Sequence, residues 1–504
     1  MKKLFLIVSC LLYSILSFAQ DTTSDTYTLV TYNVENLFDA DGVAIYDDYR
    51  PTDEDGNPHY TKEDILTKIQ NAVRVLKQYN EGKGPDVLAM VEIESDFTQG
   101  DEQSAEDFLE KYESTTLENM LGEDFNEKIA DLPSELLLLK GMTEEGMWNY
   151  EMSAGKSRIG KDGEPETVQK TVTYSRFPIA HEKTKIHHLV RARPILETWI
   201  NVQGHELVVF NNHWKSGAGS WEMEQVRHQN AEVLRARLDE LLAEDPDLDI
   251  VLAGDFNSDY NQSHRYDFEK TAVNDILRST GDEERVADGN TEYVYNLWYD
   301  FPIGERGSDT YRGKWGTLMQ MMITSGMYDD EGLQYVDNSF SRGDFGFNTF
   351  STSGEPKRWS STFSGSGYSD HLPISLKFRV ADDEVAYTNF SVNDDENWKP
   401  IEVAYSLPKD FITEEEFTAE DPRSNPAFYD EYVRATATVT SDYDFVVDGI
   451  TYDVYAPAFR LNNVLSDIAG TEQTIQFYGR FAQYRGNWQF VVESPDFITV
   501  NSED

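Results

Sequence analysis

Two short segments carry residue types suited to acid–base and ion-binding chemistry. The first, Gly367-Tyr368-Ser369-Asp370-His371, places a histidine beside a carboxylate. An imidazole with such a neighbour can exchange protons near neutral pH. The second, Gly254-Asp255-Phe256-Asn257, contains an Asp-x-Asn sequence that can hold a metal ion, a water molecule or a phosphate oxygen on a tight turn. Together the two segments indicate metal-assisted chemistry on a phosphoester.

Apolar, β-rich runs must position these residues. The run Asp86–Val91 is typical of a buried strand and ends at Glu92, while Leu248–Ala253 leads directly into Gly254. Further strands are expected at residues 27–34, 170–174, 195–202, 206–211 and 374–379, and helices at residues 62–79, 104–145 and 221–242. The helical stretch 104–145 has a polar composition. Polar residues at strand ends are where loops on a rigid frame usually carry function.

Five segments in a fixed order make the chemistry more specific. From residue 27 to residue 380, the chain resembles the endonuclease/exonuclease/phosphatase superfamily, which includes pancreatic deoxyribonuclease, apurinic endonucleases, sphingomyelinases and inositol polyphosphate phosphatases. The segments that carry the resemblance are Tyr32–Phe38, Pro85–Glu92, Asn211–Ser216, Gly254–Asn257 and Ser369–His371.

The resemblance implies a fold and a set of roles. The fold is α+β: a four-layer α/β-sandwich of the deoxyribonuclease-I-like type, with two packed, mostly antiparallel sheets flanked by helices. The implied cofactor is Mg²⁺, or Mn²⁺ or Ca²⁺ in its place. The implied metal ligands are Glu92, Asp370 and Asn33, and the implied catalytic residues are His213, Asp255, Asn257 and His371. Either Asp255 or His371 could take the proton of the attacking water.

Positively charged and amide side chains near these segments are candidates for binding substrate. They are Asn33, Arg191, Arg193 and Lys215. Arginine can grip a phosphate through its planar fork of donors. The pair Arg191 and Arg193 is equally typical of a solvated surface strand.

One position departs from the family pattern. Relatives usually carry an aspartate in a sequence resembling Gly-x-Trp-x-x-Leu-Asp, and that aspartate hydrogen-bonds an active-site histidine. Here the segment runs Gly313–Leu318 and then reaches Met319. A thioether cannot orient an imidazole in that way. Turnover could be lowered, another carboxylate could substitute, or the protein could bind without catalysing.

The N-terminus and the charge bear on location and substrate. Met1-Lys2-Lys3, an apolar run to about Leu16 and a small-residue exit predict a signal peptide over residues 1–20, and therefore a secreted or periplasmic protein with no membrane span. Cys10, the only cysteine, lies inside it, and a lipoprotein is the less favoured alternative. The net charge of −49 repels nucleic acid at long range, so a phosphodiester substrate requires local neutralisation by a divalent cation.

Beyond the domain at residues 21–380, we expect a linker or irregular segment at 381–428 and a small β domain at 429–504. Gly479–Phe490 resembles an OB-fold hairpin, in which Tyr484, Arg485 and Trp488 could stack on single-stranded nucleic acid or simply belong to a core.

The function expected from the sequence is a secreted, metal-dependent phosphodiesterase that acts as an endonuclease on DNA or RNA, with no stable protein partner. The alternatives are a phospholipid or inositol-phosphate phosphoesterase on the same fold, and a catalytically weakened binding protein.

Overall fold

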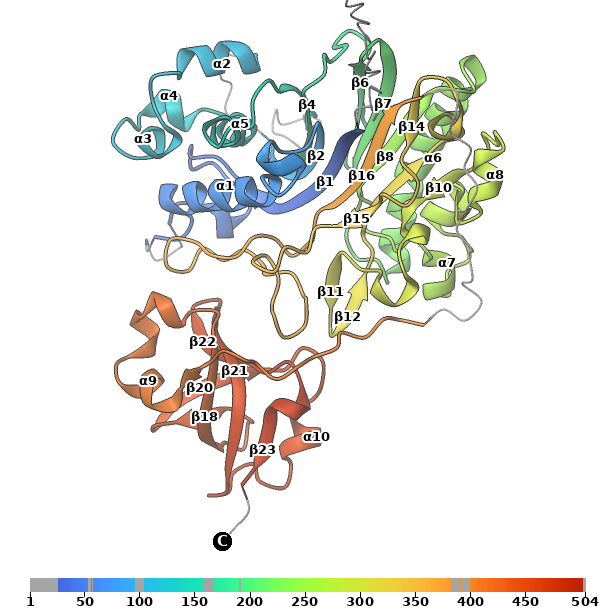
Figure 1. Ribbon diagram of the computed structural model, residues 1–504. Helices are drawn as coiled ribbons and strands as arrows, with labels where there is room; N and C mark the ends of the chain where they lie inside the picture. The colour runs from blue at the N-terminus through green and yellow to red at the C-terminus, as the bar shows by residue number, and fades with distance from the viewer. Residues whose placement is uncertain are drawn as a thin grey trace, which may run out of the picture.

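The computed structural model describes residues 26–52, 56, 58–95, 104–157, 167–189, 192–381, 390 and 399–501. The expected signal peptide with Cys10, and Arg191, lie outside these residues. Two packed sheets with helices on their outer faces form one body, and a smaller β-barrel follows near the C-terminus (Figure 1). Within the described residues, no helix is long and apolar enough to cross a membrane.

The first sheet has the order β14-β16-β1-β2-β4-β3, with β15 added beside β16. Only β1 and β2 run parallel among its pairs. Its strands are β1 (Thr26–Leu37), β2 (Val87–Glu94), β3 (Glu151–Ala154), β4 (Gln169–Ser175), β14 (Leu333–Tyr335), β15 (Ser341–Arg342) and β16 (Ile374–Val380).

The second sheet has the order β5-β6-β7-β8-β13-β10-β9. Its parallel pairs are β7 with β8 and β10 with β9, and its other pairs are antiparallel. The strands are β5 (Lys185–His187), β6 (Ile195–Val202), β7 (His205–His213), β8 (Asp249–Asp255), β9 (Ser279–Thr280), β10 (Val294–Asn296) and β13 (Met319–Ile323). A separate hairpin joins β11 (Asp309–Tyr311) to β12 (Lys314–Gly316).

Strand alternation explains why the central strands are apolar on both faces. In β2, Leu88 and Met90 pack toward the helices, whereas Val87 and Ala89 pack toward the second sheet. Because successive side chains of a strand point to opposite faces, a strand covered on both sides must be an uninterrupted apolar run. The resulting helix–sheet–sheet–helix stack is the expected four-layer sandwich, and the expectation is confirmed.

Helices cover the two outer faces. On the first sheet lie α1 (Lys62–Leu76), α2 (Ala105–Lys111), α3 (Leu117–Leu121), α4 (Glu127–Ala130) and α5 (Ser134–Glu144). On or beside the second sheet lie α6 (Trp221–Glu244), α7 (Gln262–Arg265), η3 (Ala272–Ile276) and α8 (Glu283–Ala287). Thr61 begins α1 with a capping box to Asp64. The stretch 104–145 is helical, but the expectation that it is polar is wrong for α5, whose residues from Ser134 to Met142 are all buried.

The C-terminal strands close into a barrel. They are β17 (Ile412–Thr413), β18 (Tyr432–Val439), β19 (Phe445–Val447), β20 (Ile450–Tyr455), β21 (Thr474–Tyr484), β22 (Asn487–Val491) and β23 (Ile498–Val500). The ring runs β18-β19-β20-β22-β21 and returns to β18, with α10 (Asn462–Leu465) between β20 and β21 in the chain. A five-stranded barrel is also the architecture of the OB-fold, which stays a prediction for this domain.

The barrel has its own aromatic core, which also draws in part of the segment expected to be irregular. Phe417, from α9 (Glu414–Thr418), packs in this core with Phe481 and Phe490. Of the suggested stacking residues, Tyr484 is exposed, but Trp488 is half-buried and its ring stacks on Phe481 at 4.7 Å between centroids. Trp488 therefore packs as part of the barrel wall.

A segment of the first domain, residues 357–367, lies against the barrel, and we call it the bridging loop. The Tyr429 hydroxyl donates to Ser360 Oγ at 2.7 Å, and the Phe363 ring lies 5.8 Å from that of Trp488. The same loop begins at residues that reach the candidate site described next.

Candidate active site

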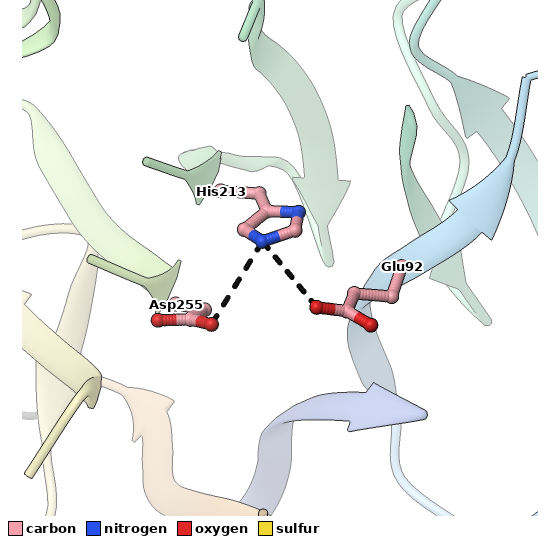
Figure 2. A group of neighbouring side chains, drawn as sticks. All are labelled: Glu92, His213 and Asp255. Carbon is pink, nitrogen blue, oxygen red and sulfur yellow. Dashed lines mark ion pairs between the residues drawn. The ribbon is translucent and has the colours of Figure 1, made fainter. Parts of the chain in front are cut away.

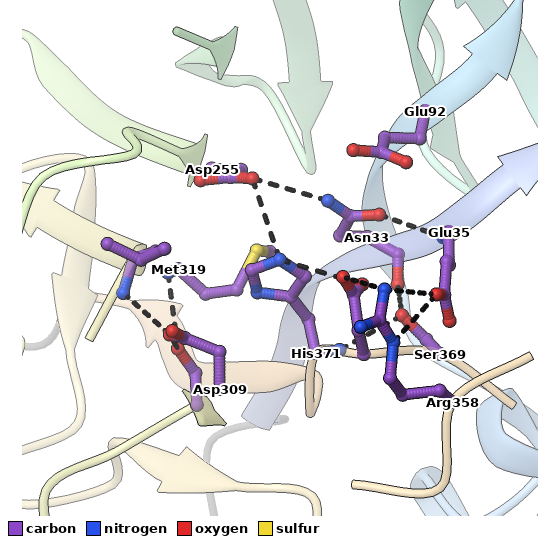
Figure 3. A network of polar contacts seen from close by, with 12 residues as sticks. Asn33, Glu35, Glu92, Asp255, Asp309, Met319, Arg358, Ser369 and His371 are labelled. Atoms are coloured by element: carbon purple, nitrogen blue, oxygen red, sulfur yellow. Dashed lines mark hydrogen bonds and ion pairs between the residues drawn. The ribbon is translucent and has the colours of Figure 1, made fainter. Parts of the chain in front are cut away.

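Strand ends bring the predicted residues to one edge of the sandwich. Asn33 lies in β1 and Glu92 in β2, which run parallel, while His213 and Asp255 end the parallel strands β7 and β8. His371 immediately precedes β16, which runs antiparallel to β1 and so begins where β1 ends. Figure 3 shows four of these residues around one space, and Figure 2 shows how His213 joins them.

Backbone irregularities occur next to Asn33 and at Glu92. The β1–β2 pairing shifts register after Asn33, and the β2–β4 pairing shifts between Met90 and Ile93. Glu92 lies inside the second irregularity with φ of +64°, a left-handed conformation that a glutamate adopts at a cost of about 1–3 kcal/mol. A bulge at a sheet edge re-aims a side chain, and strain of this kind is typical of functional sites.

Asp255 is held in place by two hydrogen bonds to its carboxylate. Its Oδ1 accepts a hydrogen bond from the Asn257 backbone N–H at 2.8 Å, and its Oδ2 accepts one from Asn33 Nδ2 at 3.3 Å. Asn257, with φ of +48°, donates through Nδ2 to the Trp214 carbonyl at 3.1 Å. Burial raises the pKa of the Asp255 carboxyl above its usual value. The Asp-x-Asn turn therefore fixes one carboxylate oxygen and leaves the other facing the shared space.

His213 lies between two carboxylates. Its Nε2 is 3.5 Å from Glu92 Oε1 and 3.9 Å from Asp255 Oδ2, contacts that carry charge only if the ring is protonated (Figure 2). Burial, followed by the charge of Arg193, holds the pKa of His213 well below its usual value. We therefore assign a neutral imidazole, for which these contacts are not ion pairs.

The pKa of His371 is shifted in the opposite direction to that of His213. Its Nε2 lies 3.8 Å from Asp255 Oδ2 and 3.7 Å from Asp370 Oδ1. Burial acts to lower the pKa of His371, but the charges of Asp370 and Asp255 outweigh it and raise that pKa to about 9. The Ser369 hydroxyl holds the backbone here, because it accepts from the His371 N–H at 3.1 Å and donates to the Asn33 carbonyl at 2.7 Å. The surroundings of the two histidines thus shift their pKa values in opposite directions.

The carboxylates fit a divalent cation. Burial and the charge of Asp370 together raise the pKa of Glu92 to about 7. Asp370 Oδ1 is buried and accepts no hydrogen bond from the described residues. One potential ligand atom each from Glu92, His213 and Asp255 also lie within 4.8 Å of one another (Figure 2). Hard cations prefer carboxylate oxygens, so the group of Glu92, His213 and Asp255 could hold a divalent ion such as Mg²⁺, Mn²⁺ or Ca²⁺, whereas the expected ligands Asp370 and Asn33 are not part of this group.

Three charged residues at this edge are absent from the sequence-based expectations. Buried Glu35 accepts hydrogen bonds from Arg358 Nε at 3.1 Å and from the Trp359 N–H at 2.7 Å, both in the bridging loop (Figure 3). Arg358 also reaches Asp370 Oδ2 at 3.4 Å. Buried Lys68, from α1, lies 4.4 Å from the centre of the Trp359 ring, and burial lowers its pKa to about 7.

The predicted substrate-binding residues differ in their burial and hydrogen bonding. Arg193 donates to the Trp214 carbonyl at 2.6 Å and to Gln169 Oε1 at 3.0 Å, and it lines a small pocket together with His213. Lys215 follows β7 and is half-buried. Arg193 is thus not a freely solvated surface arginine.

Met319 lies where the sequence pattern places it. It is fully buried in β13 and pairs with Asp255 across the β8–β13 ladder. Met319 therefore places a thioether at the position where the family pattern has a carboxylate.

The comparisons with known proteins agree with this geometry. Residues 170–380, which include His213, Asp255 and His371, match the model of the endonuclease/exonuclease/phosphatase family. The resemblance seen in the sequence motifs is thereby confirmed, and the fold is that of a phosphoesterase family.

Solved structures with a related arrangement share little sequence with the chain. A family member from Beutenbergia cavernae is 14% identical, with 71% of this chain and 72% of that chain covered and a TM-score of 0.37. One from Bacteroides thetaiotaomicron is 13% identical (72% and 98% covered, TM-score 0.37). D. rerio TDP2, complexed with a single-strand DNA product, is 12% identical (71% and 100% covered, TM-score 0.36). No curated protein matches the chain.

Proposed function

We propose that the protein is a divalent-metal-dependent phosphodiesterase that hydrolyses DNA or RNA. The observation that carries the proposal is the convergence of His213 and His371 on the buried carboxylate of Asp255, whose Oδ2 lies 3.9 Å and 3.8 Å from their Nε2 atoms. Two imidazole donors around one carboxylate suit a phosphate group that gains charge while water attacks it.

Each residue has a role in this proposal. Attack of water forms a new P–O bond while the bond to the leaving oxygen breaks; Asp255 Oδ2 accepts the proton of the water, and the leaving oxygen takes a proton from solvent. His371, held as a cation, stabilises the charge that develops on the phosphate, and neutral His213 donates a hydrogen bond to it. Because His371 is already protonated, the open choice of base falls on Asp255.

A metal ion and the positively charged side chains would supply the remaining stabilisation of the negatively charged phosphate. A divalent cation held by Glu92 would polarise the phosphate. Arg193 and Arg358 lie at the edge of the same space and are placed to bind substrate oxygens. Local neutralisation of this kind is required because the chain as a whole carries a net charge of −49.

The test is hydrolysis by the purified protein of plasmid DNA and single-stranded RNA, with Mg²⁺, Mn²⁺, Ca²⁺ or a chelator. The site variant is Asp255→Ala/His371→Ala. The matched control is Asp288→Ala/His264→Ala, which removes the same residue types from exposed positions. We expect cleavage to need metal, to be lost in the site variant and to persist in the control. Cleavage by the site variant would refute the residue assignment, and no cleavage of any substrate by the unaltered protein would refute the enzyme.

A phospholipid headgroup is a second candidate because of one loop. Val43 and Ile45 are 54% and 46% exposed in a loop whose Tyr49 hydroxyl donates to the Glu35 carbonyl. Exposed apolar side chains beside a phosphoesterase site suit a membrane surface. Hydrolysis of sphingomyelin vesicles but not of nucleic acid, reduced in Val43→Ser/Ile45→Ser, would favour this candidate.

We also propose export to the periplasm or the medium, on the basis of residues 1–20. Expression with and without this segment, followed by fractionation and N-terminal sequencing, tests it. A full-length protein retained with an intact N-terminus would refute it.

A further inference from the structure

His371 lacks a partner on the far side of its ring. Its Nδ1 is buried and forms no hydrogen bond with any described residue. A working imidazole is normally held in one orientation by an acceptor at its second nitrogen. The expected source of that acceptor is residue 319, where Met319 offers only sulfur.

A carboxylate approaches His371 from a different element. Asp309, the first residue of β11, forms an antiparallel bridge with His371, and the Leu372 N–H donates to the Ser308 carbonyl beside it at 2.7 Å. Residues directly opposite in an antiparallel bridge project to the same side. Asp309 is buried, and its charge is among those that favour the cationic form of His371.

The surroundings of Asp309 hold its carboxylate in a defined place. Oδ1 accepts hydrogen bonds from the Leu318 N–H at 3.1 Å and from the Ser308 hydroxyl at 3.0 Å (Figure 3). Oδ2 lies against Gly316, where an added Cβ would come within 2.3 Å of it. Gly316 therefore leaves the room that the carboxylate occupies, and the backbone next to Met319 orients it.

We propose that Asp309 is the carboxylate that orients His371 during turnover, in place of the missing carboxylate at position 319. The β11–β12 hairpin thus supplies what β13 lacks. Asp309 acts through His371 and is a positioning residue. No hydrogen bond joins Asp309 to Nδ1 in the structure, and we expect the carboxylate to close on Nδ1 in the working protein, as catalytic hydrogen bonds that are long in unliganded structures commonly do. The proposal rests on the proposed phosphodiesterase function for its kinetic test only.

The first test is kinetic. Asp309→Asn keeps an acceptor for the Leu318 N–H and removes the charge, so the fold is preserved. We expect kcat to fall about 10- to 100-fold, as it does when residues that hydrogen-bond and orient a functional side chain are replaced, with little change in KM or in the unfolding temperature. Asp309→Asn/Met319→Asp should recover most of the loss, because the carboxylate then arrives from β13. Glu305→Gln, an exposed neighbour, should leave kcat unchanged.

The second test does not need activity. Nitrogen-15 NMR of histidine-labelled protein reports the hydrogen bonding of each ring nitrogen, and His371→Gln identifies the His371 signals. Asp309→Asn should shift those signals, and the double variant should move them back. Unchanged signals, or a lowered kcat that Met319→Asp fails to restore, would overturn the proposal. An inactive unaltered protein with signals that shift as expected would refute the proposed function and leave the role of Asp309 standing.

Discussion

Replacing Arg358 with glutamine removes a cation held between two carboxylates of the candidate site. The guanidinium lies 3.0 Å from Glu35 and 3.4 Å from Asp370, and its side chain is 69% exposed. Unit charges about 4 Å apart interact by about 1 kcal/mol in bulk water and about 4 kcal/mol near a protein surface. Solvent screening of so exposed a group favours the lower figure.

Arg358 and a bound metal ion repel each other, so the substitution should tighten metal binding. About 1 kcal/mol corresponds to about a fivefold lower Kd for Mg²⁺. In contrast, KM for a nucleic-acid substrate should rise, because a phosphate oxygen loses a donor. Titration calorimetry with Mg²⁺ and steady-state kinetics at saturating metal measure the two effects separately.

The matched control is Arg423→Gln, which breaks an exposed pair with Asp421 in the barrel domain. It should alter neither quantity. Weaker or unchanged Mg²⁺ binding in Arg358→Gln would refute the reasoning, because it would mean that Arg358 does not compete with a cation for these carboxylates.

Three further outcomes are expected. Since the pKa of His371 is raised to about 9, its cationic form is present below that pH, and kcat should fall as pH rises through about 9; a rate that keeps rising there would contradict the cationic role. Gly316→Ala should lower kcat with the fold intact by circular dichroism, because the new Cβ displaces the Asp309 carboxylate; full activity would contradict the tight approach. Glu92→Gln should weaken Mg²⁺ binding measured by calorimetry, and chelation of the unaltered protein should abolish cleavage that added Mg²⁺ restores; retained affinity or metal-free cleavage would count against the metal site.

The sandwich and the core of the site were predictable because strand periodicity and strand ends coincide here. Runs such as Val87–Val91 are apolar on both faces only if both faces are covered. The polar residue that ends or follows each run, such as Glu92 or Asp255, must then lie at a sheet edge. Convergence of these residues therefore follows from local pattern and the parallel pairing of neighbouring strands.

Other parts of the site leave no local signal. Arg358 and Lys68 reach Glu35 and Trp359 through a loop and a helix, and the approach of each depends on tertiary packing. Glu35 lies only two residues after Asn33, but its φ of +50° and the register shift after Asn33 break the alternation of the strand, so periodicity does not place it. The position of Asp309 beside His371 depends on a β-bridge between segments that are distant in the sequence, and a local sequence pattern cannot predict such a bridge.

The bridging loop connects the barrel to the candidate site, although the barrel itself does not contact that site. At one end the loop presents Arg358 and Trp359 to Glu35, and a few residues later Ser360 and Phe363 are anchored on the barrel. A displacement of the barrel would therefore also displace the segment that places Arg358 and Trp359 beside Glu35. We infer that the barrel supports the bridging loop, so that removing the barrel would loosen the edge of the candidate site even if every residue of the sandwich were retained.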